Sequence, residues 1–161
     1  MVLPTLRLEL ASSEGLVQVA EAGATRELRF ATGSVTVARR FRSDPPSESD
    51  LEAAIEVVEE AVMPLVRTLP SGASLVCGDA LTDEVAALSA VDPLVTVVSI
   101  DAVETLFDQV ARAAQRGSWA GTTRMDATLA AAVLILREFM HHGGFKSIRR
   151  ERCVSSQDTG G

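Results

Sequence analysis

The alternation of apolar and polar positions at the start of the chain predicts three β-strands. Three leucines share one face of a strand over residues 4–10, and the same alternation continues over residues 16–20 and 26–31. Short gaps rich in small and polar residues separate these segments and suit hairpin turns. We therefore expect three consecutive antiparallel strands.

A helical period replaces this alternation after Asp44-Pro45-Pro46. Ser49 and Glu52 have the spacing of a capping box, in which each side chain binds a free backbone N–H of the other residue. Apolar residues then recur at steps of three and four as far as residue 66, and Leu69-Pro70-Ser71-Gly72 ends the segment. The spacing predicts a long helix that buries one apolar stripe.

The rest of the chain alternates short apolar segments with helical ones. We predict strands at residues 73–77, 94–98 and 145–150, and helices at residues 83–90, from 101 to the loop at 117–121, and at 126–142. The last helix is apolar around nearly its whole circumference, which is typical of a helix buried between layers. Strands interleaved with helices predict one α/β lobe over residues 1–153, with a mixed sheet flanked by helices, and a frayed tail over residues 154–161.

Composition narrows the class of protein. The chain has 161 residues, and its formal net charge of -7 argues against nucleic acid and anionic membranes as partners. No apolar run approaches the ~20 residues of a transmembrane helix. The first residues lack the order of a signal peptide, so we expect a cytoplasmic protein in which Cys77 and Cys153 are reduced thiols.

Carboxylates offer two candidate sites. Glu9 and Glu14 could form a pair for metal binding or acid–base chemistry, or they could be solvated charges at a hairpin end. The acidic run over residues 79–84 lacks the spacing and the glycine of a calcium loop, so we expect it to cap the helix that follows. His141 and His142 are adjacent and diverge by about 100° around a helix, so they cannot chelate one ion together. We expect the two imidazoles to favour the helix dipole at a C-terminus, and we predict no metal ligands.

Basic residues form two clusters that could bind phosphate oxygens, since arginine contacts such oxygens two at a time. The alternative is solvated charge that guards a strand edge. The candidate ligand-binding residues are Arg39, Arg40, Arg149 and Arg150.

Four segments match motifs of one protein family. The first is Gly33-Ser34-Val35 with Phe41 and Asp44-Pro45, similar to G-[SA]-V-x-L-x-x-x-F, and the second is Cys77-Gly78 with Ala86-Ala87-Leu88. The third is Arg124-Met125-Asp126 with Leu129-Ala130-Ala131-Ala132, similar to R-A-D-x-I-x-A-G-A. The fourth is Ser147-Ile148-Arg149 with Asp158-Thr159-Gly160. Together they resemble the second, C-terminal lobe of the exopolyphosphatase and guanosine pentaphosphate phosphohydrolase family, Ppx/GppA. The resemblance implies an actin-like, ribonuclease-H-like fold over almost the whole chain.

The family's phosphate-binding residues are changed here. The opening hairpin of the family reads D-I-G-G-G-S-T-E, whereas this chain has Glu9-Leu10-Ala11-Ser12-Ser13-Glu14-Gly15-Leu16 and keeps only the leading carboxylate, as Glu9. Asp79 and Ala80 replace the paired glycines of G-G-T-A-T-T, and the R-E-G ending has become D-T-G. The other lobe, with its D-x-G-S-x-S phosphate loop, lies outside this sequence.

These departures favour a catalytically incomplete domain. We expect a bacterial Ppx/GppA-like pseudoenzyme that acts as a regulatory or protein-interaction module without a cofactor, and that binds a protein partner or a second copy of itself. Two alternatives stay open. One is a binding protein for polyphosphate or a guanosine alarmone. The other is a residual phosphoanhydride hydrolase that needs Mg²⁺ and a partner lobe, with Glu9 as its catalytic candidate.

Overall fold

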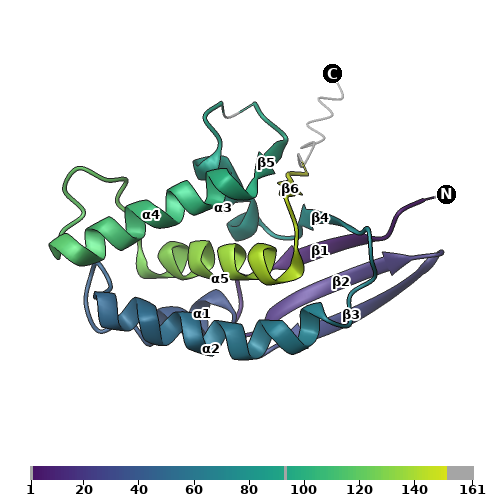
Figure 1. The fold of residues 1–161 in the computed structure, drawn as a ribbon, viewed down its shortest axis with the longest axis horizontal. Helices are drawn as coiled ribbons and strands as arrows, with labels where there is room; N and C mark the ends of the chain where they lie inside the picture. The colour runs from purple at the N-terminus through teal and green to yellow at the C-terminus, as the bar shows by residue number, and fades with distance from the viewer. Residues whose placement is uncertain (1, 93, 152–161) are drawn as a thin grey trace, which may run out of the picture.

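Six strands form one mixed sheet in the computed structural model, which describes residues 2–92 and 94–151 (Figure 1). In chain order they are β1 (Thr5–Glu9), β2 (Gly15–Glu21), β3 (Ala24–Phe30), β4 (Ser74–Cys77), β5 (Val97–Ser99) and β6 (Ser147–Arg149). The order across the sheet is β3-β2-β1-β4-β6-β5. The first three strands are antiparallel, β4 is parallel to β1, β6 is parallel to β4, and β5 is antiparallel to β6. The predicted mixed sheet is confirmed.

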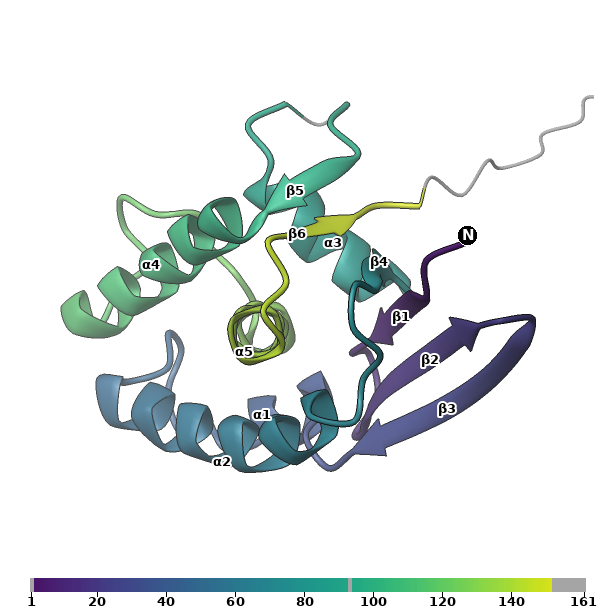
Figure 2. The same ribbon diagram turned by 45° about the vertical axis from the view of Figure 1, so that its right-hand side comes forward.

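Helix α5 occupies the middle of the molecule, with α4 on one side and α1 and α2 on the other (Figure 2). The helices are α1 (Ser34–Ala38), α2 (Glu48–Val66), α3 (Ala80–Ser89), α4 (Ile100–Arg116) and α5 (Ala127–Gly143). Every residue from 129 to 136 is buried, as the apolar circumference of this helix predicts. Phe139 of α5 stacks on Phe30 of β3, with 6.2 Å between ring centroids, and on Phe145 at 5.7 Å.

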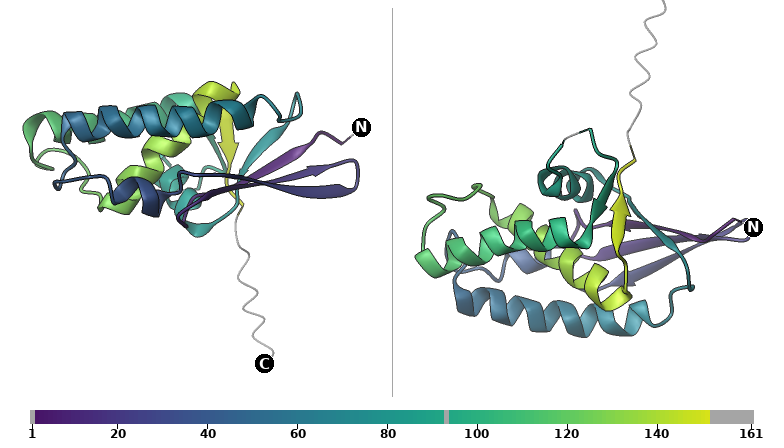
Figure 3. Two further views of the ribbon diagram at one scale, coloured as in Figure 1. Left: turned by 90° about the horizontal axis from the view of Figure 1, so that it is seen from below. Right: turned by 45° about the horizontal axis from the view of Figure 1, so that its top comes forward.

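The first two strands divide their side chains between two faces of the sheet. Leu6 and Leu8 have no exposed surface and join the core, whereas Arg7 and Glu9 point to the opposite face and are half-buried. The far end of the β2–β3 hairpin extends past the helices (Figure 3), and residues 20–27 are exposed there.

Because β1, β4 and β6 are parallel, their carboxyl ends meet at one edge of the sheet. We call this region the carboxyl edge: the ends of these three strands, the β1–β2 turn at residues 10–14, and the start of α3. In open α/β sheets, ligands bind beyond the carboxyl ends of the strands. The fold therefore directs attention to this edge.

The capping box predicted at Ser49 and Glu52 is wrong, because α2 begins two residues earlier. The Ser47 hydroxyl accepts a hydrogen bond from the Asp50 N–H at 3.0 Å, and the Asp50 carboxylate accepts one from the Ser47 N–H at 3.3 Å. The Arg42 N–H also donates to Asp50, at 3.0 Å, and this bond is the largest cause of the lowered pKa of that carboxyl. The buried Asp50 carboxylate thus accepts hydrogen bonds from the N-cap residue Ser47 and from Arg42 in the preceding segment, and these bonds fix where α2 begins.

The strand predicted over residues 94–98 is largely wrong. Asp92 forms a turn in which its carboxylate accepts from the Leu94 N–H at 2.9 Å and its carbonyl accepts from the Val95 N–H at 3.0 Å. Pairing with β6 begins only at Val97. The predicted frayed tail and Cys153 lie outside the described residues, and no helix in the described part of the chain is long and apolar enough to span a bilayer.

Candidate functional site

Two hollows lie along the carboxyl edge, and Asp79 lines both. The larger has a volume of about 610 Å³ and is lined by Arg7, Cys77, Gly78, Asp79, Ala80, Asp83, Arg150 and Glu151. The smaller, of about 260 Å³, is lined by Glu9, Ala11, Ser12, Ser13, Glu14, Leu16, Arg29 and Asp79. The candidate catalytic residue Glu9 and the candidate ligand residue Arg150 thus lie on the same edge.

The Asp79 carboxylate satisfies four donors from two parts of the chain. One oxygen accepts from the backbone N–H of Leu10 at 2.7 Å and from that of Ala11 at 2.8 Å. The other accepts from the Thr82 N–H at 2.9 Å and from the Thr82 hydroxyl at 2.6 Å, which caps α3 as predicted. Consecutive backbone N–H groups and a helix N-terminus are the donors that bind anions in many proteins. At this edge the anion is the protein's own carboxylate.

Two glycines hold the β1–β2 turn from either side. The Gly78 N–H donates to the Leu8 carbonyl at 2.8 Å, and a Cβ at Gly78 would lie 2.9 Å from that oxygen. On the other side, the Gly33 N–H donates to the Ser13 carbonyl at 2.9 Å, and a Cβ at Gly33 would lie 2.1 Å from the Ser12 carbonyl oxygen. Only glycine permits these approaches, so the turn is fixed by the start of α1 and by the end of β4.

Glu9 has a pKa above its ordinary range. Burial of the carboxyl is the first cause, the negative charges of Asp79 and Glu27 add to it, and Arg29 opposes it. The Gln18 side chain donates to this carboxylate at 3.3 Å. Such a carboxyl holds its proton more readily than an exposed glutamate, which suits acid–base work better than it suits phosphate binding.

The arginine at the end of β6 is engaged by a carboxylate. Arg150 donates to both oxygens of Asp83, at 2.9 and 3.1 Å, and the neighbouring Arg7 forms a two-pronged pair with Glu151. These pairs raise the pKa of both guanidinium groups and lower that of Glu151. A phosphate at this edge would compete with carboxylates that are already in place.

The other predicted arginines lie elsewhere. Arg149 is exposed on β6, while Arg39 and Arg40 are exposed just after α1. In Figures 1 and 2, α5 lies between α1 and β6. The structure therefore does not bring the two basic clusters together into one site.

Cys77 is an unreactive core thiol. It ends β4 with 5% of its surface exposed, and burial raises its pKa to about 12, with the charge of Asp83 adding to the shift. Because the thiolate is the nucleophilic form, a thiol with this pKa stays protonated at neutral pH and does not act as a nucleophile.

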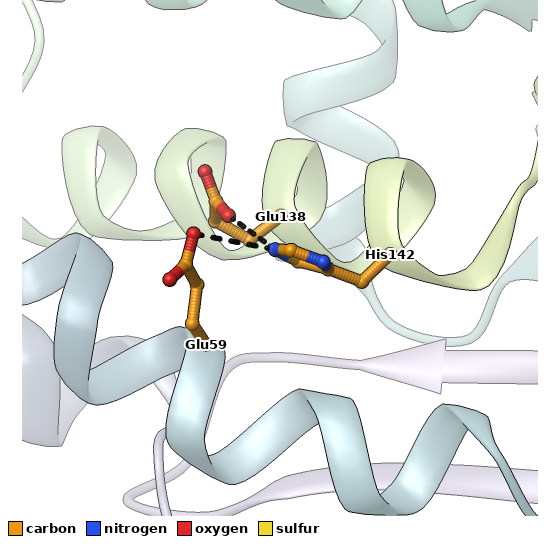
Figure 4. A group of neighbouring side chains, drawn as sticks. All are labelled: Glu59, Glu138 and His142. Carbon is orange, nitrogen blue, oxygen red and sulfur yellow. Dashed lines mark hydrogen bonds and ion pairs between the residues drawn. The ribbon is translucent and has the colours of Figure 1, made fainter.

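A second group of polar side chains lies away from the carboxyl edge. Glu59 of α2 and Glu138 and His142 of α5 point toward one another (Figure 4), and one potential ligand atom from each lies within 4.8 Å of the others. Sequence reasoning missed this group because it weighed His142 only against its neighbour His141. The signal was present in the four-residue spacing of Glu138 and His142, which places both on one face of a helix.

Comparison with known proteins identifies the fold. No protein-family model and no curated protein matches the chain. A type II variant structure of the Aquifex aeolicus Ppx/GppA phosphatase superposes with a TM-score of 0.69 at 14% identity, over 92% of this chain and 53% of that one. An exopolyphosphatase-like protein superposes with a TM-score of 0.68 at 14% identity, over 92% of this chain and 54% of that one.

The resemblance to Ppx/GppA proteins is thus confirmed at the level of the fold. This chain spans about half the length of the structures that it matches. It has the actin-like α/β fold of one part of a Ppx/GppA protein.

Proposed function

We propose that this chain is a Ppx/GppA-like domain that does not hydrolyse phosphoanhydrides and that acts by binding a protein partner. One observation carries the proposal. The backbone N–H groups of Leu10 and Ala11, which the Ppx/GppA resemblance assigns to the phosphate-binding turn, donate to the Asp79 carboxylate. The domain supplies its own anion where a phosphate would bind.

The charges around this turn oppose a phosphate as well. Phosphoryl transfer depends on donors and cations that stabilise charge at the transferred group. Here Glu9, Glu14 and Asp79 line one hollow, with Arg29 as the basic residue among them. Two like charges about 4 Å apart repel by roughly 4 kcal/mol at an effective dielectric constant of about 20. A phosphate in this hollow would therefore face repulsion from the three carboxylates.

Exposed apolar side chains support a protein partner. They lie between the end of α3 and the edge strand β5. The residues are Leu88, Val91, Leu94, Val95 and Val97. An edge strand offers backbone groups for pairing, and apolar patches beside such an edge are typical of protein interfaces.

A phosphate-release assay tests the absence of hydrolysis. Incubation with polyphosphate or guanosine pentaphosphate and Mg²⁺ is expected to release no phosphate above the protein-free blank. Release that depends on Mg²⁺ and is abolished by Glu9→Ala would contradict the proposal. It would instead support a residual hydrolase that works without a partner lobe and uses Glu9, whose raised pKa at the strand end suits acid–base chemistry.

Sedimentation velocity tests the interaction role. Val97 is 53% exposed on β5, whereas Val2 is 94% exposed at the start of the chain and serves as the matched control. We expect an assembly, of two copies or with a co-purifying protein, that Val97→Lys dissociates and Val2→Lys does not. A strictly monomeric protein that purifies with nothing bound counts against the interaction role.

The binding-protein alternative rests on Arg39 and Arg40. Both are exposed, and no ion pair within residues 2–92 and 94–151 engages either guanidinium. A thermal-shift titration with polyphosphate at low salt decides this alternative. A shift that disappears in the double variant Arg39→Gln, Arg40→Gln would establish it, and the absence of any shift would eliminate it.

A further inference from the structure

Three side chains from two helices converge on one point outside the carboxyl edge. Glu138 and His142 lie one turn apart on α5, and Glu59 reaches them from the adjacent helix α2 (Figure 4). The His142 Nε2 atom lies 3.0 Å from a Glu138 oxygen and 3.4 Å from a Glu59 oxygen. One carboxylate is buried, since Glu138 is 3% exposed.

These separations are close to those around a bound metal ion. Ligand atoms about 2.0–2.1 Å from a tetrahedral Zn²⁺ lie roughly 3.3 Å from one another. The distances from Nε2 to the two carboxylate oxygens, 3.0 and 3.4 Å, bracket that value, and the three ligand atoms all lie within 4.8 Å of one another. Small side-chain movements therefore suffice to bring the three ligand atoms to the separations of a tetrahedral ion.

The electrostatics of the group also favour a bound cation. Two carboxylates face one imidazole nitrogen, and a buried carboxylate is costly unless its charge is compensated. Arg137 pairs with Glu138 at 2.7 Å, so Glu59, Glu138 and Arg137 together carry one net negative charge beside the His142 imidazole. A cation between the three ligands offsets that charge.

We propose that Glu59, Glu138 and His142 bind a divalent transition-metal ion of the Zn²⁺ type. An imidazole with two carboxylates suits zinc, cobalt or manganese better than it suits magnesium or calcium, which take oxygen ligands alone. Arg137 orients the Glu138 carboxylate from behind, and its guanidinium lies 4.5 Å from the centroid of the Phe107 ring.

The site is open to solvent on one side. The side chains of Glu59 and His142 are 40% and 19% exposed, so an ion can enter and a water molecule can complete a tetrahedral shell. A site with three protein ligands and one open position differs from a structural zinc site, in which the protein supplies all four ligands. Binding of the ion competes with a proton for Nε2; the negative charges of Glu59 and Glu138 favour the ion, and the positive charge of Arg137 opposes it.

Metal titration of chelator-treated protein tests the site. The Cys153→Ser background removes one competing thiol. Zn²⁺ or Co²⁺ is added, and the thermal unfolding of the protein is then measured. We expect one equivalent to bind and, at 100 times its dissociation constant, to raise Tm by about 5–10 °C. Bound Co²⁺ is expected to give the visible absorption of a four-coordinate ion.

Two variants and one matched control separate the site from non-specific binding. His142→Ala is expected to abolish saturable binding, and the partly exposed Glu59→Gln to weaken it at least about 10-fold without unfolding the protein. The adjacent His141→Ala is expected to bind like the parent protein. The proposal is overturned if no saturable binding occurs, which would leave a proton on His142 as the balancing charge. It is also overturned if His142→Ala binds as tightly as His141→Ala.

Discussion

Removing the Asp79 carboxylate is expected to destabilise the domain by roughly 2–4 kcal/mol. Loss of an N-cap aspartate costs about 1 kcal/mol. The Leu10 N–H loses its partner as well, and because Leu10 is fully buried, this adds about 1–3 kcal/mol. Ala11 is exposed, so water can replace the carboxylate at its N–H.

Urea unfolding of Asp79→Ala measures this loss, with two further variants for comparison. Glu14→Ala removes a negative charge from the same hollow and should change the free energy of unfolding by less than about 0.5 kcal/mol, as exposed substitutions usually do. Asp79→Asn keeps one acceptor oxygen and turns an NH₂ group toward donors, so it should fall between the two. An Asp79→Ala variant as stable as Glu14→Ala would refute the inference that this carboxylate satisfies the turn.

Three further outcomes follow from the same structure. Because the folded pKa of Glu9 is raised, its ionisation opposes folding above that pKa, so Glu9→Gln should stabilise the domain at neutral pH but not below about pH 4 in urea unfolding. Gly33→Ala should cost about 1–3 kcal/mol in the same assay, because the new methyl group would lie 2.1 Å from the Ser12 carbonyl oxygen; an unchanged midpoint would contradict that contact. In a Cys153→Ser background, Cys77 should be alkylated at least about 100-fold more slowly in the folded protein than in urea, and equal rates would contradict its burial.

Much of the fold could be predicted from local patterns. The alternation over residues 4–31 predicted the first three strands, and the break in it marked the turn between β2 and β3, where Gly23 has a φ of 78° that glycine adopts without strain. The apolar circumference of residues 129–136 predicted the buried position of α5. These features depend on side chains close in sequence, so the chain carries their signal directly.

Other features depend on contacts between distant segments. The short helix α1 has too few residues for a period and is held by the Ser34 N–H bond to the Leu10 carbonyl at 2.9 Å. The true capping box uses Asp50 because Arg42 supplies an extra donor. The segment before Val97 had the composition of a strand, but Asp92 holds it in a turn, and within the described residues only Val97–Ser99 form a ladder with β6.

The candidate site was only partly accessible from sequence for the same reason. The lost glycines of the β1–β2 turn were visible in the chain, but the carboxylate that replaces the ligand comes from Asp79, which lies 69 residues after Leu10. The helical spacing of Glu138 and His142 was likewise visible. The position of Glu59 depends on how α2 packs against α5, which no local pattern specifies.

The central claim is that the protein's own carboxylate occupies the phosphate-binding turn. Amide resonances of Leu10 and Ala11 in ¹⁵N–¹H spectra report on it directly while polyphosphate and Mg²⁺ are added. The account predicts that neither resonance moves, because both N–H groups stay bound to Asp79. A saturable shift of both resonances would show that phosphate displaces this carboxylate, and it would contradict the account.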